Sequence, residues 1–154
     1  MCSPVLSITR RLTFCAGHRL LGHEGHCAQL HGHNYVVEVT VSAEQLNAIG
    51  MVTDFKVIKQ RLGTWLDENW DHGFLLHEAD TAAREWLEAF EIRPGERQKV
   101  YVLPINPTAE GMALYLLESV SPTLFGDLPG VEVTRIRVWE TESCFAEATK
   151  TVSG

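Results

Sequence analysis

Two runs of alternating apolar and polar residues, with histidines between them, constrain this chain more than any other feature. The runs cover about residues 5–14 and 34–42, and their alternation is typical of β-strands with one buried face. Five of the seven histidines lie between these runs, from His18 to His33. Side chains two residues apart lie on the same face of a strand, with α-carbons ~6.6 Å apart. His31 and His33 are therefore placed to reach one ion.

A third imidazole, His18, follows the first run, so pairing of the two strands would bring three histidines to one end of a sheet. Three protein ligands with a fourth position open are typical of a catalytic zinc site. Neutral imidazoles without thiolate or carboxylate partners favour zinc over iron, cobalt or nickel. We expect His18, His31 and His33 to bind Zn²⁺, and His23 and His26 to be non-ligands. The alternative is a set of half-buried histidines that share no ligand.

The spacing of residues leaves two roles open for Cys27. It can be a fourth zinc ligand, which would close the site and make it structural. It can instead lie beside an open site as a base or nucleophile, because a nearby cation raises the thiolate fraction of a cysteine. Cys2, Cys15 and Cys144 are interpreted as packing or incidental cysteines.

Two acidic features have both a structural and a chemical interpretation. Asp71 precedes His72 directly, and a carboxylate beside an imidazole can orient it for general acid–base catalysis. The same pair can also be a surface turn after a helix. Glu140 continues the apolar face of a third alternating run. It is either a strand end that reaches water or a carboxylate that accepts two adjacent N–H groups of a planar ligand.

The remaining elements complete an α+β domain. Helical spacing predicts a helix over about 55–69 with Asp54 as its N-cap, and a short helix after Asp80. Asn106-Pro107 predicts the start of another helix, which we expect to end before Pro122. The third run, 131–140, can form a hairpin with 143–149. We expect one domain over 1–154, with an antiparallel sheet and helices on one face.

Composition excludes several functional classes. The net charge is −7 and the sequence pI about 5.4, which argues against general binding to nucleic acid or anionic membranes. The four cysteines form no Cys-x-x-Cys pair, and the sequence contains neither a signal-peptide core nor an apolar stretch long enough for a membrane span. We therefore expect a reduced, cytoplasmic, soluble protein.

Several motifs together resemble those of the 6-pyruvoyltetrahydropterin synthase family, in order and over nearly the whole chain. They are Phe14-Cys15-Ala16-Gly17-His18-Arg19-Leu20, Cys27-x-x-x-His31-Gly32-His33-Asn34-Tyr35, Val52-Thr53-Asp54-Phe55, Trp70-Asp71-His72, Asn106-Pro107-Thr108-Ala109-Glu110 and Val138-Trp139-Glu140-Thr141. The resemblance implies the tunnelling fold, a ββααββ unit whose sheets join into a barrel in a homotrimer, and commonly a hexamer of two trimers. The chain departs from the compact family pattern by a longer connection at about 74–105.

Carried over to this sequence, the resemblance makes His18, His31 and His33 the zinc ligands and Cys27 the catalytic thiol. Asp71 and His72 match the proton-relay pair, and Glu140 matches the carboxylate that anchors the pterin. The site would form between subunits, so that Cys27 and His72 need not meet within one chain. Residues that bind triphosphate stay unassigned, with Arg10, Arg11, Arg19 and Lys56 as unranked candidates.

The resemblance implies a zinc-dependent lyase acting on 7,8-dihydroneopterin triphosphate. We favour the bacterial branch, which releases acetaldehyde and triphosphate to form 6-carboxy-5,6,7,8-tetrahydropterin on the route to queuosine. The alternative is the branch that eliminates triphosphate and keeps a 6-pyruvoyl side chain for biopterin synthesis. An alternative of another class is a non-catalytic zinc-binding scaffold of the same fold. A pterin aldolase or cyclohydrolase fits less well, because those enzymes lack this histidine–cysteine arrangement.

Overall fold

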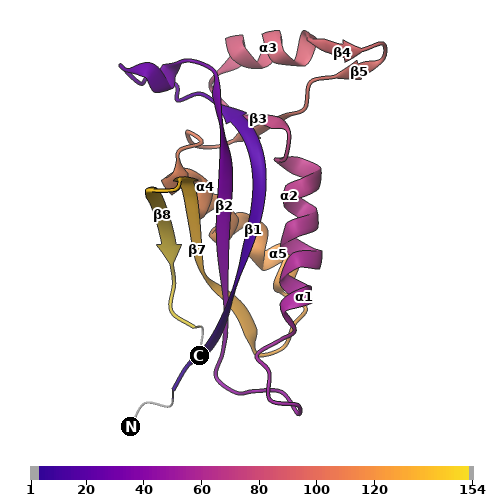
Figure 1. Cartoon of the computed structure of the whole chain (residues 1–154), viewed down its shortest axis with the longest axis vertical. Helices are drawn as coiled ribbons and strands as arrows, with labels where there is room; N and C mark the ends of the chain where they lie inside the picture. The colour runs from indigo at the N-terminus through magenta and orange to yellow at the C-terminus, as the bar shows by residue number, and fades with distance from the viewer. Residues whose placement is uncertain (1–3, 153–154) are drawn as a thin grey trace.

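A computed structural model describes residues 4–152, and a six-stranded curled sheet is its central element. The strand order is β6-β3-β1-β2-β7-β8, and Figure 1 shows β1, β2, β7 and β8 side by side. The strands are β1 (Leu6–His18), β2 (His31–Ala43), β3 (Gly73–His77), β6 (Val100–Leu103), β7 (Val131–Thr141) and β8 (Cys144–Thr149), and a separate hairpin consists of β4 (Glu91–Arg93) and β5 (Glu96–Arg97). Cys2 lies outside the described residues.

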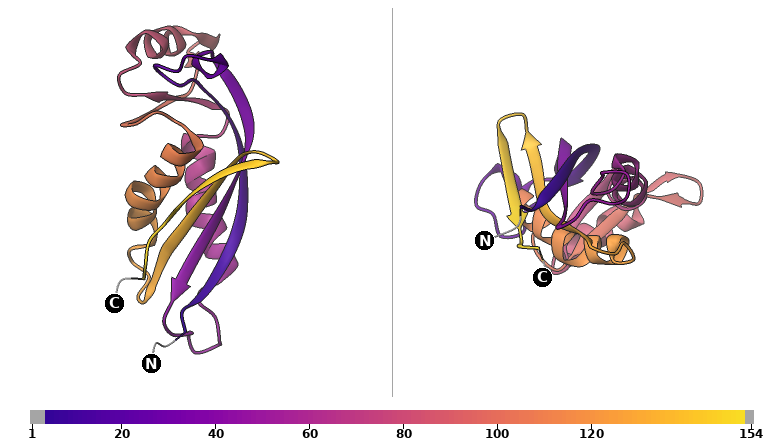
Figure 2. Two further views of the ribbon diagram at one scale, coloured as in Figure 1. Left: turned by 90° about the vertical axis from the view of Figure 1, so that its left-hand side faces the viewer. Right: turned by 90° about the horizontal axis from the view of Figure 1, so that it is seen from below.

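Two long helical segments cover one face of the sheet (Figures 1 and 2). The first contains α1 (Phe55–Ile58), a π-helical turn (Lys59–Gly63) and α2 (Thr64–Asn69), and the second contains α4 (Ala109–Tyr115), a π-helical turn (Leu116–Val120) and α5 (Ser121–Phe125). The two remaining helices are α3 (Thr81–Ala89) and a short 3₁₀ helix, η1 (His26–Ala28). The core lies between the sheet and the helices, as the predicted α+β class requires.

The first two strands pair along their full length, and both are longer than the alternating runs predicted. His18 pairs with His31, and Ala16 pairs with His33, because β1 and β2 are antiparallel and in continuous register. Every second residue of β1 from Leu12 to His18 is buried on the helix-covered face. Gly32 allows close approach, since a Cβ there would lie 3.1 Å from the Ala16 carbonyl oxygen.

The helix starts show where the sequence analysis was right and where it was wrong. Asp54 is the N-cap of α1 and accepts a hydrogen bond from the Lys56 amide, as predicted. The N-cap of α4 is Thr108, not Asn106, and its hydroxyl accepts from the Gly111 amide. The Asn106 side chain instead bonds the backbone of Leu21 in both directions, at 2.9 Å each. A tertiary contact therefore removes Asn106 from the role of cap.

The second long helix does not end before Pro122, contrary to prediction. Helical structure continues through Ser121–Phe125, with Pro122 in the first turn after the π-helical segment. A proline there is tolerated, because the change of hydrogen-bond register at a π turn already interrupts the i→i−4 ladder.

The connection at 74–105 adds strands that make the sheet mixed rather than wholly antiparallel. β3 pairs parallel with β1 and with β6, while β1, β2, β7 and β8 are antiparallel. α3 begins after Asp80, which caps it as predicted and which also accepts two hydrogen bonds from Arg19 at 2.5 and 2.8 Å. Arg19 follows His18 directly, so this ion pair fixes the start of α3 to the end of β1.

Candidate metal and proton-relay sites

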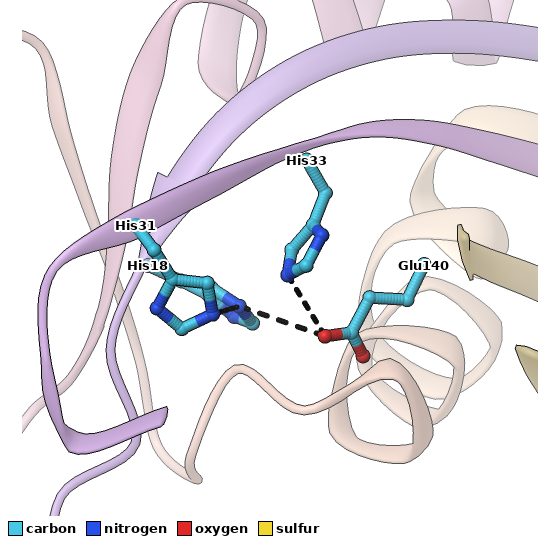
Figure 3. Close-up of side chains that lie close together, drawn as sticks. All are labelled: His18, His31, His33 and Glu140. Atoms are coloured by element: carbon cyan, nitrogen blue, oxygen red, sulfur yellow. Dashed lines mark hydrogen bonds and ion pairs between the residues drawn. The ribbon is translucent and has the colours of Figure 1, made fainter. Parts of the chain in front are cut away.

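Three imidazoles converge at the end of the β1–β2 ladder. His18 comes from β1, and His31 and His33 come from β2. These three residues, here called the histidine cluster, each offer a nitrogen that lies within 4.8 Å of the others and of a Glu140 oxygen (Figure 3). The structure therefore brings together the three residues that the sequence predicted as metal ligands.

Backbone carbonyls orient two of these rings. The Nδ1 of His18 lies 2.7 Å from the Pro107 carbonyl oxygen, and the Nδ1 of His31 lies 2.7 Å from that of Gln29. A neutral ring that donates from Nδ1 leaves the lone pair of Nε2 free, which is how metal-binding histidines are commonly held. The two Nε2 atoms are 3.0 Å apart. Two nitrogens on one tetrahedral zinc ion are about 3.3 Å apart, so the rings fit such an ion with little movement.

The ring of His33 has a buried nitrogen, Nε2, without a hydrogen bond to any of the described residues. The nearest charged group is Glu140, whose Oε1 lies 2.9 Å away as an ion-pair contact without hydrogen-bond geometry. A buried ring nitrogen that faces two other ring nitrogens and a carboxylate fits a divalent cation.

The electrostatics of His18 suit a neutral ligand. Burial lowers the pKa of its ring below 6.5, and it prevails over the raising effects of the bond to Pro107 and the charge of Glu140. The side chain of His18 is only 1% exposed. An imidazole must be neutral to bind a metal, so the fold prepares this ring for coordination.

Cys27 is not a member of this cluster. It lies in η1, in the loop between β1 and β2, where its carbonyl accepts a hydrogen bond from the Leu20 amide, and its side chain is half-buried. Glu140, rather than Cys27, is the fourth group beside the three imidazoles. Glu140 is 29% exposed at the end of β7, and its role as a carboxylate that accepts from a planar ligand stays a prediction.

Asp71 and His72, here called the relay pair, form a hydrogen-bonded dyad in the turn after α2. The Nδ1 of His72 lies 2.7 Å from an Asp71 oxygen, and the other oxygen accepts from the Cys15 amide at 2.9 Å. Burial would raise the Asp71 pKa, but the bonds from Cys15 and His72, with the charges of His72 and Lys99, lower it below its usual value. The carboxylate is therefore ionised near neutral pH.

The structure does not bring the relay pair to the histidine cluster. Cys15 and His18 are an odd number of residues apart on β1, so their side chains lie on opposite faces of the sheet. The His72 ring is 77% exposed, whereas the His18 ring is buried. His72 also has a φ of 59°, which is rare for a residue other than glycine and often marks a functional position.

Several positioning groups escaped the sequence analysis. The carbonyls of Pro107 and Gln29 carry no side-chain signal, so nothing in the sequence distinguishes them. Gln98 and Lys99, at the end of the connection, donate to the carbonyls of His72 and Asp71 at 3.4 and 2.6 Å. Arg19, one of four candidates for triphosphate binding, is already paired with Asp80. Within the described residues, no helix is long and apolar enough to cross a membrane.

Comparison with known proteins identifies the family. Residues 7–151 match the model of the family described as 6-pyruvoyl tetrahydropterin synthase. A Rickettsia bellii protein named 6-carboxy-5,6,7,8-tetrahydropterin synthase is 44% identical over 143 residues, which cover 93% of this chain and 99% of the relative. An Aquifex aeolicus protein of the same name is 34% identical over 79% of this chain and 74% of its own.

Solved structures agree with the fold. An uncharacterized protein from Wolinella succinogenes superimposes with a TM-score of 0.77 at 24% identity, over 97% of this chain and all of the other. A 6-pyruvoyl tetrahydropterin synthase from Plasmodium vivax gives a TM-score of 0.68 at 20% identity, over 97% of this chain and 99% of the other. The half-barrel sheet, its covering helices and the family match over nearly the full length lead to one conclusion: this chain belongs to the 6-pyruvoyl tetrahydropterin synthase family.

Proposed function

We propose that this protein is a zinc-dependent carbon–carbon lyase of the 6-carboxy-5,6,7,8-tetrahydropterin synthase type. It would convert 7,8-dihydroneopterin triphosphate and water to 6-carboxy-5,6,7,8-tetrahydropterin, acetaldehyde and triphosphate. The observation that carries the proposal is the convergence of three inward-facing imidazoles in a chain whose relatives at 40–44% identity are named for this activity. A neutral His₃ donor set with room for a further ligand is typical of catalytic zinc.

In this proposal His18, His31 and His33 hold the ion. Zinc, when bound, supplies a Lewis acid that lowers the pKa of substrate hydroxyl groups. Glu140 anchors the pterin ring, because one carboxylate can accept hydrogen bonds from two adjacent N–H donors. The Glu140 side chain is 29% exposed beside the histidine cluster, so a ligand can reach it.

Cys27 and the relay pair would move protons on the two sides of the substrate. As a thiolate, Cys27 would move protons between carbon and oxygen atoms of the substrate. On the other side of the substrate His72, oriented by Asp71, would donate or accept protons. The relay pair lies on the opposite sheet face from the histidine cluster, which supports a site shared between chains. We therefore propose that the protein is a trimer, or a dimer of trimers, in which Cys27 of one chain faces His72 of another.

The deciding experiment is incubation of the purified protein with 7,8-dihydroneopterin triphosphate, followed by mass analysis of the pterin and trapping of aldehyde. We expect 6-carboxy-5,6,7,8-tetrahydropterin and acetaldehyde in equal amounts. A 6-pyruvoyl product without acetaldehyde would assign the chain to the biopterin branch instead. No turnover by protein that retains one zinc ion per chain would overturn the enzyme and leave the zinc-binding scaffold.

A further inference from the structure

A thiol that the proposed mechanism does not use lies beside the relay pair. Cys15, Asp71 and His72 each offer one ligand atom, and the three atoms lie within 4.8 Å of one another. Cys15 is half-buried and free, and His72 is exposed. A mixed thiol, carboxylate and imidazole group at such distances matches the ligand types that zinc binds in proteins.

The backbone fixes these three residues relative to one another. The Cys15 amide donates to Asp71 at 2.9 Å, and the His72 amide donates to the Cys15 carbonyl at 2.7 Å. The Gln98 side chain also donates to the His72 carbonyl, at 3.4 Å. Ligands that are already held in place lose little entropy on coordination, so the arrangement is suited to capturing a cation.

The site is open to solvent ions. Cys15 and His72 line a cavity of ≈ 530 Å³ together with Phe74 and Gln98, and His31 and His33 border the same cavity. The ionised Asp71 supplies negative charge, but the Lys99 ammonium donates to the Asp71 carbonyl at 2.6 Å and opposes a second cation. We therefore expect weaker binding here than at the histidine cluster, where Glu140 adds a negative charge at 2.9 Å from His33.

We propose that Cys15, Asp71 and His72 form a second, lower-affinity site for a thiophilic divalent cation such as zinc, and that its occupancy inhibits the enzyme. Binding itself does not depend on the proposed function. Inhibition does rest on it, because an imidazole that coordinates a cation cannot carry a proton for the reaction. The chain would thus hold one activating ion and, at higher metal concentration, one inhibitory ion.

The test is a titration of the metal-free protein with Co²⁺. Binding is monitored through the near-ultraviolet charge-transfer absorption from sulfur to cobalt. Wild type is expected to bind two equivalents per chain, with the sulfur band appearing only with the second. Cys15→Ser should lose the second equivalent and the band, whereas Cys27→Ser and Cys144→Ser should keep both. His72→Asn, which suits a positive φ, should weaken the second equivalent without disturbing the backbone.

Three outcomes would overturn the site: one equivalent only in wild type, a sulfur band that persists in Cys15→Ser, or a band that disappears in Cys27→Ser. Inhibition is tested separately by turnover of the zinc-loaded enzyme in rising free zinc. Measured relative to its own rate without added zinc, Cys15→Ser should need at least 10-fold more zinc for half-inhibition, and an unchanged inhibition curve would refute the inhibitory role. If no turnover is found at all, the cobalt titration still decides the metal site.

Discussion

The histidine cluster and the relay pair both lie where strand β1 ends and strands β2 and β3 begin, but they differ in burial and completeness. Three rings of the cluster meet within one chain, two of them oriented by backbone carbonyls, and His18 is nearly inaccessible. The relay pair is fixed equally well by the backbone, yet its imidazole projects into solvent. The comparison teaches that one end of a sheet can hold two ordered groups of residues, one buried and one exposed, on its opposite faces.

The largest effect is expected from removing one member of the histidine cluster. His31→Ala should lower zinc affinity more than about 100-fold and abolish turnover, because two imidazoles are left for an ion that needs at least three protein ligands. Metal content after dialysis against a weak chelator measures this loss. His26→Ala, a change in the loop just before β2 and outside the cluster, is the control and should retain zinc. Equal loss from both variants would contradict the assignment of ligands.

A Cys27 variant distinguishes a closed structural zinc site from an open catalytic one. Cys27→Ala should keep zinc and reduce turnover by about 10²–10⁴-fold, the usual range for a general acid–base group. Cys144→Ala, at an exposed position, should change neither quantity. Loss of zinc from Cys27→Ala would make the thiol a ligand and remove the reason to treat the site as open.

Mixing variants tests whether the two regions belong to different chains. Cys27→Ala and His72→Asn should each be nearly inactive alone. Oligomers reassembled from equal amounts of both should recover about one active site in four, because random neighbours then supply one intact Cys27 and one intact His72. Activity that stays at background after verified chain exchange would show that both groups act within one chain.

The smallest effect is a pH dependence of stability that comes from the buried ring of His18. Because His18 has a pKa lowered below 6.5, the unfolded chain takes up its proton first as the pH falls. The metal-free protein should therefore lose stability below pH 6.5, by at most about 1.4 kcal/mol per pH unit, and regain it above. Urea unfolding at pH values on either side measures this slope. His18→Gln should reduce the slope.

The sequence predicted the parts of this molecule that follow from local periodicity. The alternation of β1 and β2 and the two-residue spacing of His31 and His33 placed both rings on one face. The cap at Asp54 was predictable because its side chain bonds an amide only two residues along the chain. Long-range contacts decided the rest. Asn106 and Thr108 are both good capping residues, and only the bonds to Leu21 determine which one caps α4.

Other features had no local signal at all. The parallel pairing of β3 with β1 and β6 depends on a connection whose composition does not specify a neighbour. Glu140 was placed on an apolar strand face, but its contact with His33 depends on the register between β2 and β7. The assignment of zinc, Cys27 and the relay pair to one reaction remains a prediction that came from the resemblance.

The backbone of His72 has a consequence for how this position can change during evolution. With φ at 59°, glycine, asparagine and aspartate are the residues that replace histidine with least strain. None of these three titrates near neutral pH as an exposed side chain. A lineage that loses His72 therefore has no low-strain substitution that restores a proton carrier there, and the position is expected either to stay histidine or to mark a descendant that has abandoned this chemistry.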